Sequence, residues 1–149
     1  VDPAGRTVYQ ANAARLNREI GALDSRIRST LGALPAARRK VVTSHDAFAY
    51  FGRAYGFRFI APVGISTDAE PSAADIAAII RQIRKEKIRA MFIENIADPR
   101  LLERISRESG ARVGGTLYSD SLATAGSPAD TYLGMMRENT RTIEAALAD

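Results

Sequence analysis

The side chains in this sequence that are best suited to chemistry are an imidazole and two carboxylates, each at the end of an expected strand. His45 is the only histidine among 149 residues and follows a short β-branched run. Glu94 and Asp120 follow two later apolar runs. Because the carboxyl ends of parallel strands meet at one edge of a sheet, the three side chains could converge on one crevice. Imidazole nitrogen and carboxylate oxygen suit zinc, and also manganese or iron.

The same residues fit two other interpretations. A single histidine can be a buried structural residue, and an aspartate before a Ser/Gly-rich loop can be a turn or cap residue. Ser44 beside His45, with Glu94 or Asp120 to orient the imidazole, also matches the residue list of a hydrolase. Adjacent strand residues point to opposite sides, however, and the sequence contains no Gly-x-Ser-x-Gly, phosphate-binding or dinucleotide-binding motif. The pattern therefore favours a protein that is not an enzyme, with metal binding and a structural histidine both open.

An alternation of strands and helices would position these side chains. Strands are expected at residues 41–44, 57–63, 88–93 and 112–117. Helices are expected at residues 46–55, from Ser72 through Ile83, from Pro99 to Gly110, and over 132–147. Strands that alternate with helices predict an α/β fold, in which a four-stranded parallel sheet carries helices on both faces.

A long amphipathic helix is predicted before the sheet, from about Asp2 to Leu34. Its apolar residues recur at spacings of three and four, at Leu16, Ile20, Leu23, Ile27, Leu31 and Leu34. We therefore divide the chain into a long helix (residues 1–35) and an α/β lobe (residues 36–149). So long a helix could pack on the sheet, form a coiled coil, or connect the lobe to another part of the protein.

The charge balance is basic but does not indicate nucleic-acid binding. The formal net charge is +4, with a pI near 9.8. The lysines and arginines are spread over helix faces with few aromatic residues among them, and no helix-turn-helix or RNA-binding motif is present. We interpret them as a solvated basic surface. The absence of cysteine excludes disulfides and thiolate metal sites.

Several short motifs, in a fixed order, carry a resemblance to a known family. They are residues 43–51 with 54–56, then 64–72, 92–95, 117–122 and 132–139. In this order they resemble segments of the carboxyl-terminal lobe of the zinc/manganese-specific solute-binding proteins of bacterial ABC transporters, which include adhesin-like lipoproteins. The first of them is similar to the segment that supplies the third metal ligand in that family.

The resemblance implies two α/β lobes joined by one rigid helix, with the metal between the lobes. This chain would be the connecting helix and the carboxyl-terminal lobe, without the amino-terminal lobe. By matched position, His45 would be the third metal ligand and Asp120 the fourth, and Glu94 would support the site without bonding to the metal. Two further ligands, usually histidines, would come from the other lobe. Manganese receptors often carry glutamate at the position of His45, so histidine favours Zn²⁺ over Mn²⁺ as cargo.

The function implied is a receptor in the periplasm, or on the extracytoplasmic face of the bacterial membrane, that hands a metal ion to a membrane permease. Four protein ligands leave no open position for activating water, which suits transport rather than catalysis. The lobe alone would bind metal weakly, since it supplies two ligands of four. Two other hypotheses stay open: an interaction module that dimerises through the exposed long helix, and a basic nucleic-acid-binding domain.

Overall fold

A four-stranded parallel sheet forms the centre of the structure, a computed structural model that describes residues 2–62 and 71–148. The strands lie in the order β2-β1-β3-β4 and are β1 (Lys40–Thr43), β2 (Arg58–Ile60), β3 (Ala90–Glu94) and β4 (Arg112–Leu117). Every pairing is parallel, as the alternation of strands and helices predicts. From β1 the chain crosses to β2 on one side, and then passes back over β1 to β3 on the other side. The direction in which strands are added therefore reverses between β1 and β3. Such a reversal is where open α/β sheets bind their ligands.

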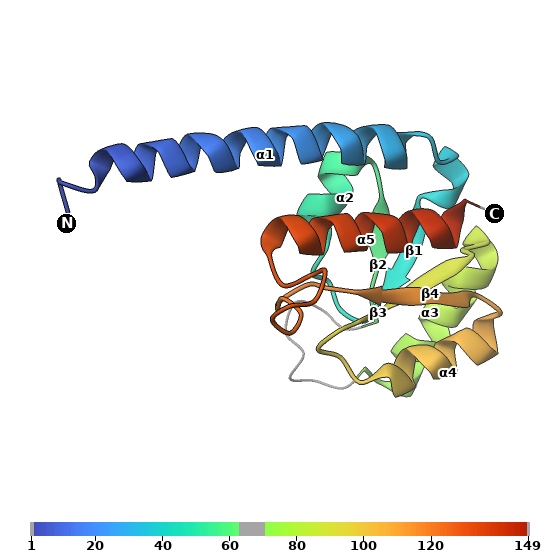
Figure 1. Cartoon of the computed structure of the whole chain (residues 1–149). Coiled ribbons are helices and arrows are strands. Elements are labelled where there is room, and N and C mark those ends of the chain that lie inside the picture. The colour runs from blue at the N-terminus through green and yellow to red at the C-terminus, as the bar shows by residue number, and fades with distance from the viewer. Residues whose placement is uncertain (1, 63–70, 149) are drawn as a thin grey trace.

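Helices cover both faces of the sheet, which confirms the predicted fold class (Figure 1). One face carries α1 (Arg6–Gly32), α2 (Ala49–Tyr55) and α5 (Tyr132–Leu147), and the other carries α3 (Ala73–Glu86) and α4 (Pro99–Ser109). Successive strand residues point to opposite faces, so Phe92 joins the core under α1 and α5, whereas Met91 joins the core under α3 and α4. Both side chains are fully buried.

The predicted helix ends are set by local chemistry. The Ser72 hydroxyl accepts a hydrogen bond from the Asp75 N–H, and the Asp75 carboxylate accepts one from the Ser72 N–H, which forms a capping box at the start of α3. Gly56 and Gly110 end α2 and α4 with φ angles of 74° and 84°. This left-handed conformation carries little penalty only for glycine, which explains why these two residues stop their helices.

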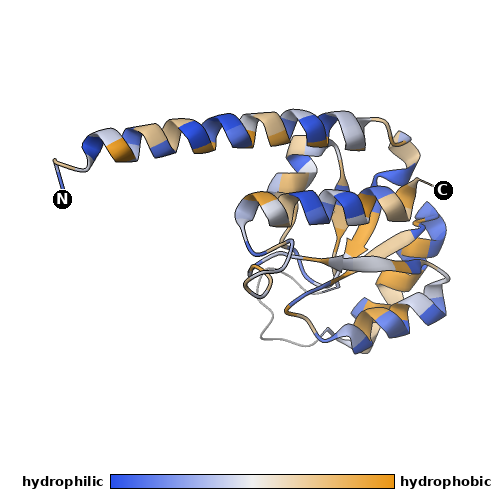
Figure 2. Ribbon diagram, in the orientation of Figure 1, coloured by the Kyte–Doolittle hydropathy of each residue, from blue (hydrophilic) through white to orange (hydrophobic). Residues whose placement is uncertain are grey.

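The long helix α1 packs on the lobe through its carboxyl-terminal half only. Leu23, Ile27 and Leu31 are buried in the core where α1 packs on α5 and α2, whereas Val8 and Leu16 are 59% and 47% exposed. The amino-terminal half extends beyond the lobe (Figure 1), and orange apolar positions continue along it (Figure 2). The apolar stripe is therefore longer than the surface that it covers.

Some boundaries differ from those expected. The long helix spans 6–32 rather than 2–34, because the Asp2 carboxylate accepts from the Gly5 N–H and holds a turn before it. The second strand was expected at 57–63, of which residue 63 lies outside the described residues. It is observed at Arg58–Ile60, and it starts after Phe57 because the Phe57 N–H bonds to the Gly52 carbonyl of α2.

The helix expected at 46–55 begins at Ala49, because a turn follows His45. The third strand begins at Ala90 rather than Ile88, whose N–H bonds to the end of α3. A short 3₁₀ helix at Ala36–Arg38 was not expected. The loop expected at 64–70 lies outside the described residues. Within residues 2–62 and 71–148, no helix combines the length and apolar character needed to span a bilayer.

Candidate metal centre

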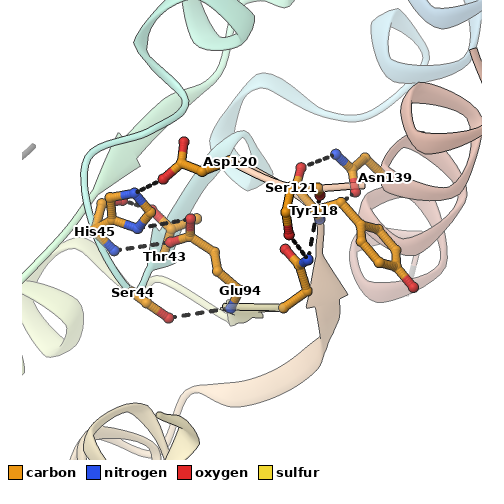
Figure 3. Close-up of polar contacts among 9 residues, drawn as sticks. Thr43, Ser44, His45, Glu94, Tyr118, Asp120, Ser121 and Asn139 are labelled. Carbon is orange, nitrogen blue, oxygen red and sulfur yellow. Dashed lines mark hydrogen bonds and ion pairs between the residues drawn. The ribbon is translucent and has the colours of Figure 1, made fainter. Parts of the chain in front are cut away.

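The three side chains singled out by the sequence meet at the carboxyl edge of the sheet (Figure 3). His45 lies two residues beyond the end of β1, Glu94 is the last residue of β3, and Asp120 lies three residues beyond β4. His45 and Glu94 therefore leave the two strands between which the strand order reverses. The position matches the one that sheet topology predicts for a ligand site.

His45 and Asp120 touch directly. The Nε2 atom of His45 and the Oδ2 atom of Asp120 lie 2.9 Å apart. The imidazole is buried, with 4% of its side chain exposed, but 59% of the Asp120 side chain is exposed. The pair thus consists of a fixed nitrogen and a carboxylate that faces the surface.

Glu94 contacts His45 at two points. Its Oε1 atom accepts a hydrogen bond of 2.9 Å from the backbone N–H of His45, and its Oε2 atom lies 2.9 Å from Nδ1 of the ring. The second contact is close but not aligned as a hydrogen bond, so Nδ1 and Oε2 have no hydrogen-bond partner among the described residues. With its side chain fully buried, Glu94 fixes both the backbone and the ring of His45.

Two hydroxyl groups complete the buried support of this corner. The Thr43 hydroxyl donates a hydrogen bond of 3.1 Å to the backbone carbonyl of His45, and the Ser44 hydroxyl accepts one of 3.3 Å from the backbone N–H of Glu94. The Ser44 oxygen is thus directed to the β3 backbone rather than to the imidazole. This arrangement lacks the serine–histidine contact that the hydrolase interpretation requires.

The donor set suits a divalent metal ion shared by His45 and Asp120. A histidine that ligates metal typically presents one nitrogen to the metal and the other to a carboxylate, which is how Nε2 and Nδ1 are disposed here. Tetrahedral ligation at about 2.1 Å sets two ligand atoms about 3.4 Å apart. The 2.9 Å contact would need to open by only about half an ångström, which the exposed Asp120 side chain permits.

Two ligands do not fill a metal site. Among residues 2–62 and 71–148, no group of three or more histidine, cysteine, aspartate or glutamate side chains is arranged to hold a metal ion. Glu94 directs both oxygens at His45, one at its N–H and one at its ring. In this geometry Glu94 acts on the histidine and not on the position between Nε2 and Asp120.

Sequence reasoning did not identify two asparagines that hold the Asp120 segment. Asn139 bonds to the backbone of Tyr118, and Asn95 bonds to Ser121, so the two amides hold residues that precede and follow Asp120 in the sequence. The available signal was a polar amide beside the apolar residues on the inner face of the last helix, where Asn139 is 2% exposed.

Comparisons with known proteins agree with the fold and show the family. The family described as "Zinc-uptake complex component A periplasmic" (ZnuA) matches residues 1–146. Zinc-binding protein TroA of Treponema pallidum is 41% identical over 145 residues, which cover 94% of this chain and 46% of TroA. Manganese-binding lipoprotein MntA of Bacillus subtilis is 33% identical, with 97% of this chain and 49% of MntA covered. Iron-binding protein YfeA of Yersinia pestis is 34% identical, with 95% and 46% covered.

Solved structures show the same relationship. The periplasmic zinc-binding protein TroA from Treponema pallidum superposes with a TM-score of 0.95 at 36% identity, over 99% of this chain and 55% of that one. The manganese-bound periplasmic metal-binding protein from Candidatus Liberibacter asiaticus gives a TM-score of 0.85 at 26% identity, over 98% and 54%. The chain spans about half the length of the curated relatives it matches. Since the family match extends over almost all of its residues, the chain belongs to the ZnuA family of periplasmic zinc-uptake components.

Proposed function

We propose that this chain is the carboxyl-terminal lobe and connecting helix of an extracytoplasmic receptor that captures Zn²⁺, or secondarily Mn²⁺, for uptake by an ABC transporter. The observation that carries the proposal is the 2.9 Å contact between Nε2 of the only histidine and Oδ2 of Asp120. The contact lies at the ligand-binding edge of the sheet, in a chain of the ZnuA family.

In this proposal His45 and Asp120 are metal ligands, and the metal ion is cargo rather than a resident cofactor. Glu94 holds the Nδ1 side of the imidazole and leaves Nε2 directed towards Asp120. The remaining ligands would come from an amino-terminal lobe, since the curated relatives are about twice as long as this chain. An imidazole ligand favours Zn²⁺, whereas relatives are named for zinc, manganese or iron.

The shape of α1 supports the two-lobe arrangement. Val8, Tyr9 and Leu16 are exposed on the half of α1 that extends beyond the lobe. A lobe packed against this half would bury them and would lie on the same side as the carboxyl edge of the sheet (Figure 1). The metal would then lie between the two lobes, with His45 and Asp120 on one wall.

The proposed location and partner come from the relatives. Two are named as manganese-binding or manganese ABC transporter substrate-binding lipoproteins, and others as periplasmic proteins. We infer that the intact protein works outside the cytoplasmic membrane and delivers its metal to the permease of a transporter. Protons compete with the metal for imidazole nitrogen, so acidification should release the cargo.

Calorimetric titration of zinc into this chain and into the intact two-lobe protein tests the proposal. We expect weak binding by the chain and tight binding by the intact protein, with a loss of at least about tenfold when His45 or Asp120 is changed to alanine. Thermal unfolding of both variants should stay cooperative. Equally tight binding by the lobe alone would contradict the divided site. Binding that survives both substitutions would contradict the ligand assignment.

Self-association is a second property that the exposed stripe of α1 favours. Without another lobe, Val8 and Leu16 of two chains could cover one another. Sedimentation velocity over a hundredfold concentration range would detect such a dimer. In the intact protein the stripe would already be covered, and dimerisation should disappear.

A further inference from the structure

The segment that carries Asp120 is held by side-chain amides at both ends. We propose that Asn95 and Asn139 are positioning residues that fix the Asp120 carboxylate beside His45. This inference rests on the proposed metal-binding function only where it concerns affinity. The part that concerns the position of Asp120 applies to the metal-free chain.

Asn139 holds the residue two positions before Asp120. Its Oδ1 atom accepts a hydrogen bond of 2.8 Å from the Tyr118 N–H, and its Nδ2 atom donates one of 2.8 Å to the Tyr118 carbonyl. The amide thus pairs with both backbone groups of one residue, as a neighbouring strand would. Since Asn139 is 2% exposed and belongs to α5, it fixes the exit of β4 to that helix.

Asn95 holds the residue that follows Asp120. Its Nδ2 atom donates a hydrogen bond of 2.7 Å to the Ser121 hydroxyl and lies 3.4 Å from the Ser121 carbonyl. Its backbone N–H also donates to the carbonyl of Leu117, at the end of β4. The residue after β3 is therefore bonded to the segment on both sides of Asp120.

Asp120 itself has little to hold it. Its side chain is 59% exposed, and its one side-chain hydrogen bond among the described residues is the contact with His45. A metal ion placed between Nε2 and Oδ2 would break that contact. The aspartate would then be located by its backbone alone, and the backbone is fixed by Asn95 and Asn139.

Two consecutive residues, the last of β3 and the one after it, thus serve one metal-site residue each. Glu94 fixes His45 through its carboxylate (Figure 3). Asn95 fixes the Asp120 segment through its amide. The end of β3 then sets the distance between Nε2 of His45 and Oδ2 of Asp120. Such supporting groups typically change metal affinity by about 10- to 100-fold when they are removed.

The metal-free chain provides the first test, since the ring of the only histidine reports on Asp120. In ring nitrogen NMR spectra, Asn95→Ala should shift the His45 Nε2 signal towards that of Asp120→Ala, and backbone relaxation should show increased motion at 118–121. The control is Asn17→Ala, on the exposed face of α1, which should leave both unchanged. Unchanged His45 and backbone signals in Asn95→Ala would overturn the proposal, whether or not the chain binds zinc.

Zinc titration of the intact protein provides the second test. We expect Asn95→Ala and Ser121→Ala each to weaken zinc binding about tenfold, and the double variant to be no weaker than either one. In the Asp120→Ala background, Asn95→Ala should have no further effect, because it acts through that aspartate. Additive losses would overturn the proposal. If the unaltered protein fails to bind zinc, the proposed function fails, and the NMR test still decides the positioning role.

Asn139 is tested by Asn139→Leu, which keeps the size of the side chain and removes both hydrogen bonds. The Tyr118 amide should then lose protection from hydrogen exchange, and the His45 ring signal should move as in Asn95→Ala. Because Asn139 is buried, the variant is compared with Thr140→Val, a substitution of a neighbouring buried residue that leaves both hydrogen bonds between Asn139 and Tyr118 intact. An equal shift of the His45 signal in both variants would overturn the specific role of Asn139.

Discussion

Glu94 contacts both the backbone and the ring of His45: its Oε1 atom lies 2.9 Å from the backbone nitrogen of His45, and its Oε2 atom lies 2.9 Å from Nδ1 of the ring. One buried carboxylate therefore sets both the path of the chain after β1 and the rotation of the imidazole. The other ring nitrogen is left facing Asp120 at the surface. This relationship turns Nε2, rather than Nδ1, towards the position where a metal ion could bind.

Glu94→Gln should disfavour the ring form of His45 that binds metal. When Nε2 binds a metal ion, the ring proton lies on Nδ1 and faces the Glu94 carboxylate. In the variant the amide oxygen would keep the bond to the His45 N–H, so an NH₂ group, which cannot accept, would face that proton. Zinc affinity should therefore fall by about 10- to 100-fold, which calorimetric titration of the intact protein measures.

The matched control for that substitution is Glu103→Gln, an exposed position on α4 that removes the same charge far from the site. It should leave the His45 spectrum and the zinc affinity unchanged. Unaltered zinc affinity in Glu94→Gln would contradict this role of Glu94.

His45→Glu should lower the preference of the intact receptor for zinc over manganese. Carboxylate oxygen suits manganese better than imidazole nitrogen does, whereas imidazole suits zinc. The ratio of the two dissociation constants, measured by competition titration, should move towards manganese. His45→Ala is the control, since it removes a ligand without replacing it and should weaken both metals. A ratio that stays constant in His45→Glu would contradict a direct bond between residue 45 and the metal.

Much of this arrangement could be predicted from the sequence because it depends on local chemistry. The spacing of apolar residues predicts the helices, and parallel strands bring residues that follow them to a common edge, where His45, Glu94 and Asp120 could converge. The support of the site depends on contacts between distant residues. Asn139 pairs with a backbone 21 residues away, and Asn95 with a hydroxyl 26 residues away. Neither partner can be identified from the sequence, because each contact forms only when distant segments fold together.

Tyr55 should make stability depend on pH in the alkaline range. Burial, followed by the hydrogen bond from its hydroxyl to Asp24, raises the pKa of Tyr55 from 10.0 to about 12. A pKa that is higher in the folded state favours folding fully below pH 10, and this contribution disappears as the pH rises through about 12. Chemical denaturation of wild type and Tyr55→Phe between pH 9 and pH 12 measures the effect.

The Tyr55→Phe variant lacks the ionisable group, so its stability should fall less steeply over this interval. Tyr50→Phe serves as the control, because Tyr50 is 82% exposed and should behave like wild type. Identical pH profiles for wild type and Tyr55→Phe would contradict the role of the Tyr55–Asp24 contact in fastening α2 to α1.

The two halves of α1 should respond differently to the loss of a leucine side chain. Leu31 is fully buried in the core, and Leu31→Ala should lower the free energy of unfolding of this chain by about 2–5 kcal/mol. Leu16 is 47% exposed, and Leu16→Ala should change it by no more than about 0.5 kcal/mol. Urea denaturation followed by circular dichroism measures both values.

The same pair of variants in the intact protein tests what covers the amino-terminal half of α1. If an amino-terminal lobe packs on this stripe, Leu16 becomes a buried residue, and Leu16→Ala should then cost about as much as Leu31→Ala does. Arg15→Ala, at an exposed neighbouring position, is the control and should be neutral in both proteins. A Leu16→Ala variant that remains neutral in the intact protein would show that this half of α1 stays uncovered, which would contradict a second lobe seated on the helix.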